Sequence, residues 1–171
     1  MKLSLIGQLK SAVFTVQLAA RSLGNLATVT RAPEVKNVSV QFVAAFNSTI
    51  DFVQTVTSMQ GDKLTSQNAD ALFKDMRHIW SADATTIETL RQYGLTQGLN
   101  GKLTLDAIRF DAEQKSAPQA VEGALAQIGQ SVDESAAQEL FASGRIEAFQ
   151  TLLKQRTALL QNQQKMLASN G

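Results

Sequence analysis

Residues 95–105 read LTQGLNGKLTL, and this stretch interrupts a sequence whose apolar residues otherwise recur at helical spacing. Leu103 and Leu105 alternate with polar neighbours, which is typical of a half-buried strand. Asn100 and Gly101 favour a type I′ turn, because both residue types tolerate a positive φ angle. The stretch therefore predicts one small β-hairpin at about residues 95–105.

An amphipathic helix is predicted near the N-terminus. Its apolar residues alternate between spacings of three and four, so they form one seam along a helical face. The members of this seam are Ile6, Leu9, Val13, Val16, Ala20 and Leu23. Gly24 and Asn25 are typical of a helix C-terminus, and the helix is expected to end there.

Three more helices are predicted before the hairpin. Residues 27–37 are expected to form an extended connector, and Ser39 is expected to be the N-cap of a long second helix. A third helix is predicted from near Asn68. Asp83 is expected to cap a short fourth helix that ends at Gly94.

Three helices are also predicted after the hairpin. Asp106 is expected to cap a short helix, and Pro118 to open another that ends at Gly129. The last helix is predicted over about residues 134–168, with a weak point at Ser143-Gly144.

These elements predict a mainly α-helical bundle with long N- and C-terminal helices and the one hairpin. Two units are expected. Residues 1–130 are predicted to form a helical inner domain that includes the hairpin. Residues 131–171 are predicted to contain the long C-terminal helix, packing back in antiparallel fashion on the N-terminal helix.

The C-terminal helix has a wide apolar stripe of the kind found in bundles and coiled coils. One set of apolar residues recurs every seven positions, and a second seam runs beside it. These two sets are Leu152, Leu159 and Met166, and Ile146, Phe149, Leu153 and Leu160. Arg156 and Gln163 interrupt the second seam, and two interpretations stay open. In a lone helix these side chains are solvated, whereas in a coiled coil they set the register against a partner.

The terminal helices supply the candidate interaction residues. Their apolar seams exceed what two helices alone need to bury, so their expected role is helix packing within or between chains. The candidates are Leu9, Val13, Val16, Leu152, Leu153, Arg156, Leu159, Leu160 and Gln163.

Composition argues against several classes of function. Lys and Arg total 16 and Asp and Glu total 15, so the net charge of +1 gives no electrostatic reason to expect a nucleic-acid partner. Cysteine is absent, which excludes disulfides and thiolate metal sites. No apolar run approaches the roughly 18 residues of a membrane span, so no membrane insertion is expected.

No catalytic, cofactor or metal site emerges from the sequence. His78 is the only histidine, and it lacks a second nitrogen or sulfur ligand for a metal. No serine lies in a nucleophile-elbow motif, and the glycines near the hairpin match neither the dinucleotide nor the P-loop spacing. The glycosylation sequon at Asn47 lies within a predicted helix and is discounted. The sequence therefore predicts a protein that is not an enzyme and needs no cofactor.

A set of motifs follows one order along the chain. Residues 7–13 read GQLKSAV, residues 42–50 read FVAAFNSTI, and residues 90–106 read LRQYGLTQGLNGKLTLD. FDA at 110–112 and PQAV at 118–121 come next. This order resembles the flagellar filament cap protein (hook-associated protein 2) family. That family has a Leu-Lys-Ser-Ala helix, a Phe-Val-x-Ala-Tyr-Asn helix, a Gly-x-Leu-x-Leu-Asp hairpin segment and a Pro-x-Ala-Val helix start.

The resemblance implies a reduced form of the helical inner domain of a cap protein. The family inserts large β-rich outer domains between its first two helices, whereas only residues 27–38 join them here. The family also begins with a terminal helical segment, and few residues precede residue 7 here. The resemblance further implies secretion through the flagellar type III route, self-association into a homo-oligomeric ring, and contact with flagellin or another axial protein at the filament tip.

A second hypothesis stays open. The alternative is a cytoplasmic helical adaptor or secretion chaperone that binds an exported helix in a groove. The near-zero charge, the absence of cysteine and the long C-terminal helix all allow this. The hairpin favours the cap-like hypothesis, because a simple helical chaperone has no need for it.

Overall fold

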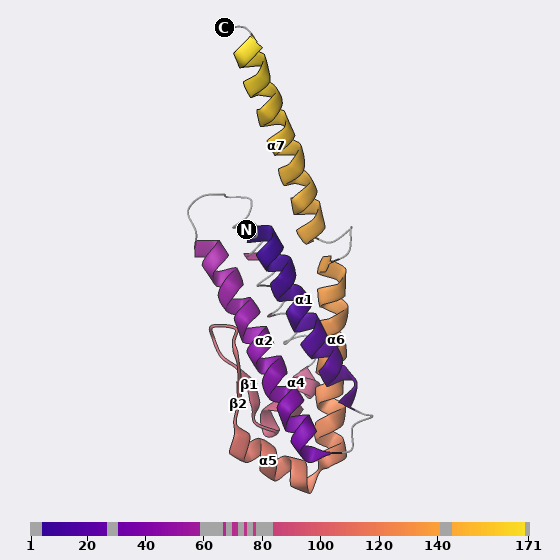
Figure 1. The fold of residues 1–171 in the computed structure, drawn as a ribbon. Coiled ribbons are helices and arrows are strands. Elements are labelled where there is room, and N and C mark those ends of the chain that lie inside the picture. The colour runs from indigo at the N-terminus through magenta and orange to yellow at the C-terminus, as the bar shows by residue number, and fades with distance from the viewer. Residues whose placement is uncertain are drawn as a thin grey trace.

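The computed structural model describes residues 5–26, 31–58, 84–140 and 145–169, together with residues 67, 70, 71, 74 and 77. Its elements are α1 (Leu5–Gly24), α2 (Ala32–Ser58), α4 (Ala84–Gln92), β1 (Leu95–Gln97), β2 (Leu103–Leu105), α5 (Ala107–Ser116), α6 (Pro118–Leu140) and α7 (Arg145–Ser169). The described part is mainly helical with one two-stranded antiparallel sheet, which confirms the predicted fold class (Figure 1).

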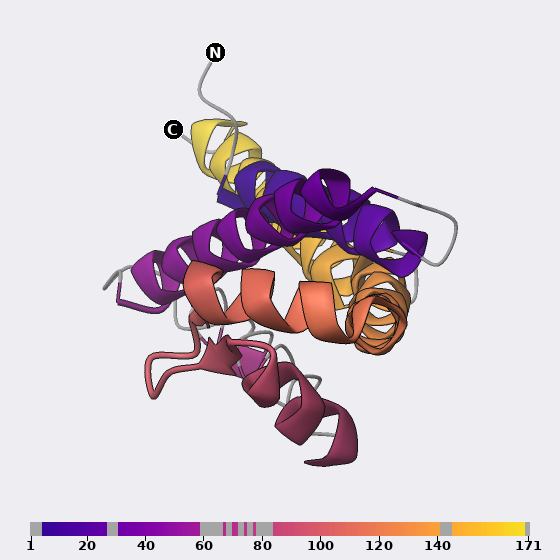
Figure 2. The same cartoon turned by 90° about the horizontal axis from the view of Figure 1, so that it is seen from below.

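Helices α1, α2 and α6 form the body of the bundle. Helix α1 packs along both of the others, and its main antiparallel neighbour is α6 (Figure 1). Figure 2 shows α4 and the hairpin on the opposite side of the bundle from α1. Helix α7 extends beyond the end of α6 and away from the bundle (Figure 1). The expected division into units 1–130 and 131–171 stays a prediction.

The core lies where the three main helices meet α5 and the hairpin. Its largest fully buried side chains are Phe42 and Phe46 of α2 and Phe110 of α5. The rings of Phe42 and Phe46 are tilted, with their centroids 5.9 Å apart. The predicted N-terminal seam is confirmed for the side chains that the structure describes, and these buried members are Leu9, Val13, Val16, Ala20 and Leu23.

Helix α2 begins at Ala32, so the predicted extended connector at 27–37 is wrong from residue 32 onward, and Ser39 is not an N-cap. Ser39 is buried within the helix, and its hydroxyl donates to the carbonyl one turn earlier at 2.8 Å. Pro33 is tolerated in the first turn, where backbone N–H groups have no intrahelical acceptor. Glu34 in the same turn interacts favourably with the helix dipole. These two residues are the local signal for the earlier start.

Helix α6 runs through Gly129 without a break, so the predicted helix end at Gly129 and the predicted new helix at about Glu134 are both wrong. Gly129 lies where α1 and α6 cross. A Cβ atom added there would lie 2.5 Å from the Gly24 nitrogen and 2.6 Å from the Ala20 carbonyl oxygen. Glycine is therefore required at this position by the close approach of two helix backbones, and not by helix termination.

The predicted hairpin is confirmed, but its turn differs. Strands β1 and β2 pair in antiparallel register with Leu95 opposite Leu105. In the loop, the Gly101 N–H donates to the Gly98 carbonyl at 3.0 Å, and Gly101 has φ 80°. Asn100 does not have a positive φ, so the turn is not type I′. The loop between the strands is longer than two residues. Within it Gly101 alone has a positive φ, whereas a type I′ turn requires a positive φ at two successive residues.

Other local predictions are also confirmed. Asp106 caps α5, and its carboxylate accepts from the N–H groups of Ile108 and Arg109, each at 3.1 Å. Pro118 is the first residue of α6, and α1 ends at Gly24.

Some predictions fall on residues outside the described ranges. They are the start of the third helix near Asn68, the environment of His78, the N-cap Asp83 and the weak point Ser143-Gly144. These stay predictions.

Three polar side chains of α2 hold the hairpin against the bundle. Asn47 donates from Nδ2 to the Leu103 carbonyl at 2.8 Å, and its Oδ1 accepts from the Leu103 N–H at 2.7 Å. Asp51 pairs with Lys102 at 2.6 Å, and Gln54 donates to a loop carbonyl at 2.9 Å. The three α2 residues lie on one face because their spacings are four and three. The hairpin is therefore docked by side chains that pair with its backbone.

Replacing Asn47 with alanine is expected to lower the free energy of unfolding by about 2 kcal/mol. The change removes both hydrogen bonds to the part-buried backbone of Leu103, leaving its donor and acceptor unpaired. Urea denaturation measures this loss. Asn37→Ala is the matched control, because Asn37 is exposed on the same helix and gives the same change in helix propensity. Equal stabilities for the two variants would show that the Asn47 contacts do not hold the hairpin.

Candidate functional site

Helix α7 presents an exposed apolar stripe, which is the candidate functional site. The exposed fractions are 62% for Leu159, 54% for Leu160, 67% for Met166 and 76% for Leu167. Arg156 and Gln163 are exposed on the same helix. The side chains of Leu152 and Leu153 lie outside the described ones, so their place in the stripe rests on helical periodicity. Helix α7 extends away from the bundle (Figure 1), and the four exposed side chains Leu159, Leu160, Met166 and Leu167 do not belong to the core cluster of the described residues.

The candidates on α1 have a different environment. Leu9, Val13 and Val16 are buried and belong to the core cluster of this chain, so their packing is within the chain. The outer face of α1 instead exposes Phe14 by 52% and Leu18 by 48%. This pair was not among the residues predicted from the sequence. The signal was two large apolar residues one turn apart on the otherwise polar face of the helix.

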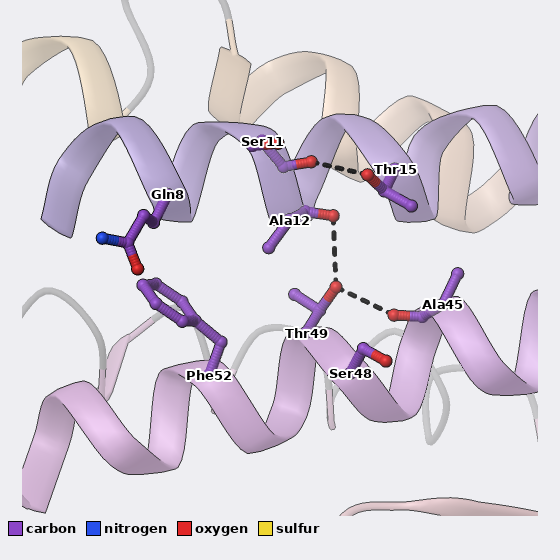
Figure 3. Close-up of a pocket in the computed structure, with 8 residues that line it drawn as sticks. All are labelled: Gln8, Ser11, Ala12, Thr15, Ala45, Ser48, Thr49 and Phe52. Atoms are coloured by element: carbon purple, nitrogen blue, oxygen red, sulfur yellow. Dashed lines mark hydrogen bonds between the residues drawn. The ribbon is translucent and has the colours of Figure 1, made fainter. Parts of the chain in front are cut away.

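A shallow groove of about 320 Å³ lies between α1 and α2 (Figure 3). Its lining residues are Gln8, Ser11, Ala12, Thr15, Ala45, Ser48, Thr49 and Phe52. The Thr49 hydroxyl lies 3.0 Å from the Ala45 carbonyl oxygen and 3.2 Å from the Ala12 carbonyl oxygen. Thr49 thereby links the two helices across the floor of the groove. None of the eight side chains is titratable, so the groove has no group for acid–base chemistry.

An ion pair joins α1 to α6 near the Gly24–Gly129 crossing. Arg21 donates from Nε to Asp133 Oδ2 and from Nη2 to Asp133 Oδ1, each at 3.1 Å. The hydrogen bond from Arg21 lowers the pKa of the Asp133 carboxyl below its ordinary value, partial burial opposes this, and a hydrogen bond from Gln17 adds to it. Because the pKa is lower in the folded state, the pair stabilises the fold at neutral pH. That stabilisation is lost as the pH falls below about 4.

The Arg21→Met variant is expected to raise the pKa of Asp133 toward its ordinary value. It should also narrow the difference in stability between about pH 7 and about pH 2, because less proton uptake is then linked to unfolding. NMR titration of the side-chain carboxyl carbons measures the pKa directly. Arg91→Met is the control, since Arg91 pairs with Glu88 on α4 and not with Asp133. An Asp133 pKa that is unchanged in Arg21→Met would contradict the assigned pair.

Within the described ranges, no cluster of three or more His, Asp or Glu side chains is placed to hold a metal ion. Across the same residues, no helix combines the length and apolarity needed to cross a membrane.

A protein-family model described as "Flagellar hook-associated protein 2 C-terminus" matches residues 25–170. The chain belongs to this family. The match includes α2, the hairpin, α5, α6 and α7, and it confirms the resemblance for the motifs from residue 42 onward. The motif at residues 7–13 lies outside the matched residues. No curated protein and no solved structure shows a significant match to the chain.

Membership of the hook-associated protein 2 family places the chain among structural proteins of the flagellum, with a role related to the filament cap. The family is not one of enzymes. The physical features agree with such a role, because the described surface offers exposed helical faces and a groove without titratable side chains.

Proposed function

We propose that the chain is a structural component of a flagellar cap that self-associates as a homo-oligomer and contacts flagellin at the filament tip. The observation that carries the proposal is the exposed stripe of α7, in a chain that belongs to the hook-associated protein 2 family. Large apolar side chains on a helix that projects from its own domain stay in contact with water. A second surface that covers them removes this apolar area from water, which stabilises the complex.

Two surfaces are proposed to make these contacts, one with the axial partner and one with other copies of the chain. The stripe of α7 contacts the axial partner, because it is the most exposed apolar face and lies farthest from the bundle (Figure 1). Phe14 and Leu18 on the bundle serve self-association, since a half-exposed aromatic residue beside a leucine is typical of a small protein contact. Two separate surfaces on one chain allow a ring to form while its members remain bound to a filament.

The proposed location is outside the cell, on the flagellum, after export. The alternative, a cytoplasmic adaptor or secretion chaperone, predicts a chain that stays in the cell. An antibody against the chain, applied to cell lysate, culture medium and sheared filaments of a flagellated host that encodes it, distinguishes the two. Detection at filament tips or in the medium supports the proposal. Detection in the lysate alone, while flagellin is present in the medium, contradicts it.

A further inference from the structure

The loop that joins β1 and β2, here called the hairpin tip (residues 98–102), exposes one large apolar side chain. Leu99 in this loop is 97% exposed. The backbone on both sides of it is held by hydrogen bonds. The Gly98 N–H donates to the Lys102 carbonyl at 2.9 Å, and a side-chain amide of α2 donates to the Asn100 carbonyl at 2.9 Å. A surface that covers Leu99 therefore has little of the loop left to order, which favours binding.

The hairpin tip has no unpaired charge. Lys102 is its only charged residue, and it pairs with Asp51 of α2 at 2.6 Å. Asn100 is neutral, and its Oδ1 accepts from the Lys102 N–H at 3.1 Å. The two glycines of the tip have no side chain that could shield Leu99. The tip is therefore suited to placing one leucine in a neutral hollow.

The shallow groove between α1 and α2 is a hollow of this kind (Figure 3). Its volume of about 320 Å³ exceeds that of one leucine side chain. The small residues Ala12 and Ala45 keep the space open, and Phe52 gives it an apolar side (Figure 3). Ser11 and Ser48, which also line it, are exposed. Because none of the lining side chains is titratable, an apolar group that enters the groove displaces water without desolvating a charge.

The hairpin tip and the groove lie on different sides of α2. Three residues of this helix contact the hairpin, and three others line the groove. The two sets are Asn47, Asp51 and Gln54, and Ala45, Ser48 and Phe52. At 100° per residue, the centres of the two sets are about 130° apart around the helix. The tip of one chain therefore cannot enter the groove of the same chain, and a contact between them would join two copies head to tail.

The apolar area of the groove continues onto the outer face of α1. Phe14 follows Ser11 by three residues, and Leu18 follows Thr15 by three, so each lies beside a groove residue on the helix surface. Phe14 is 52% exposed and Leu18 is 48% exposed. These two side chains can cover the loop backbone around an inserted Leu99.

Other described faces of a second copy fit the hairpin tip less well. Helix α5 exposes Ile108 by 85%, but the charged Arg109 is exposed next to it. Helix α2 exposes Val40 by 48%, and the charged Lys36 lies one turn before it. Helix α4 has an ion pair on its exposed face. Covering these charged groups costs desolvation free energy, whereas covering the groove does not.

We propose that the hairpin tip of one copy inserts Leu99 into the α1–α2 groove of a second copy. The contact is apolar at its centre and neutral throughout. Because its area is small, a single contact is weak, and repetition of the contact around a ring stabilises the assembly. This inference rests on the self-association in the proposed function and adds the two surfaces that meet.

The test uses engineered cysteines, because the chain has none of its own. One preparation has Asn100→Cys in the hairpin tip, and a second has Ser48→Cys at the groove. A short bismaleimide is expected to link these two at least tenfold faster than it links the tip variant to Asn37→Cys. Asn37 is exposed on the same helix, about 16 Å from Ser48 along the helix axis. Mass spectrometry of the linked peptides distinguishes tip–groove products from homodimers.

Two further variants test whether Leu99 itself makes the contact. Leu99→Ser, added to the tip preparation, is expected to slow the linking at least tenfold, because burial of the leucine side chain no longer favours the contact. Ile108→Ser removes an apolar side chain of similar exposure from α5 and is expected to leave the rate unchanged. Circular dichroism checks that each variant retains its helix content.

Equal linking rates at positions 48 and 37 would overturn the inference. A rate that Leu99→Ser leaves unchanged, or that Ile108→Ser lowers as much, would also overturn it. Added flagellin monomer tests the other occupant: if flagellin slows alkylation of the tip cysteine and a second copy does not, the tip binds flagellin and the inference is wrong. A homo-oligomer in light scattering without the tip–groove product disproves this inference alone. Tip–groove linking in a chain that is confined to the cytoplasm disproves the proposed function alone.

Discussion

Replacing Gly129 with alanine is expected to lower the free energy of unfolding by about 3 kcal/mol, at the upper end of overpacking costs. The added methyl group would lie 2.5 Å from the Gly24 nitrogen and 2.6 Å from the Ala20 carbonyl oxygen. Both neighbours are backbone atoms, which cannot turn aside as a flexible side chain can. Removing the clash with the new methyl group therefore requires α1 and α6 to move apart. Thermal unfolding should show a midpoint lowered by roughly 10 °C for a chain of this size.

The matched control for Gly129→Ala is Gly123→Ala on the same helix. A Cβ atom at Gly123 meets nothing within 4 Å. Alanine is favoured over glycine in a helix, so this control is expected to gain about 0.5–1 kcal/mol. The two substitutions are chemically identical and are predicted to have opposite signs. If both variants were stabilised, α1 and α6 would not approach as closely as the structure has them.

Replacing Leu159 and Leu160 together with glutamine is expected to weaken binding to flagellin by at least ~100-fold, while the thermal unfolding midpoint stays within about 2 °C. The two side chains are 62% and 54% exposed, so they contribute little to the fold and much to any surface that covers them. Glutamine has nearly the helix propensity of leucine, which keeps α7 helical. Differential scanning calorimetry and a flagellin binding isotherm measure the two effects on one preparation.

Ala158→Gln serves as the control for this double variant, because residue 158 lies on the face of α7 opposite the stripe. It adds a glutamine to the same helix without removing apolar surface, and it is expected to bind as the unmodified chain does. A large loss of thermal stability in the double variant would show that the stripe belongs to the core. Unchanged binding would remove α7 from the proposed contact.

Local features of the fold were predictable from the sequence because their causes are local. The seam of α1, the hairpin strands and the Asp106 cap each depend on residues within one or two turns of each other. The predicted start of α2 was wrong because the sequence has two local signals for a helix start, and the later one was chosen. Ser39 is a common N-cap residue, but Pro33 and Glu34 mark the true first turn.

Features that depend on distant residues were not predictable. A glycine such as Gly129 indicates a helix end by local rules, whereas contact with Gly24 on α1 determines its role here. Asn47 binds the backbone of Leu103, fifty-six positions away in sequence. No local pattern indicates that contact. The polar residues Asp51 and Gln54, on the same face of α2 as Asn47, indicate only that this face does not pack in the apolar core.

The candidate site was predicted in part. Periodicity placed Leu159, Leu160, Arg156 and Gln163 on one helical face, and the structure leaves these four side chains exposed. Periodicity alone does not distinguish a seam that packs within the chain from one that awaits a partner. Leu9 and its seam on α1 fall in the first class because α2 and α6 cover them, and only tertiary structure shows this.

We propose that this chain is an assembly protein of the flagellum, which associates with itself and with flagellin. Light scattering behind size exclusion tests it most directly, over a concentration series of the chain alone and then with flagellin monomer. We expect a mass above that of the monomer for the chain alone, and a further complex when flagellin is added. A monomer mass that is independent of concentration and unaffected by flagellin would contradict it.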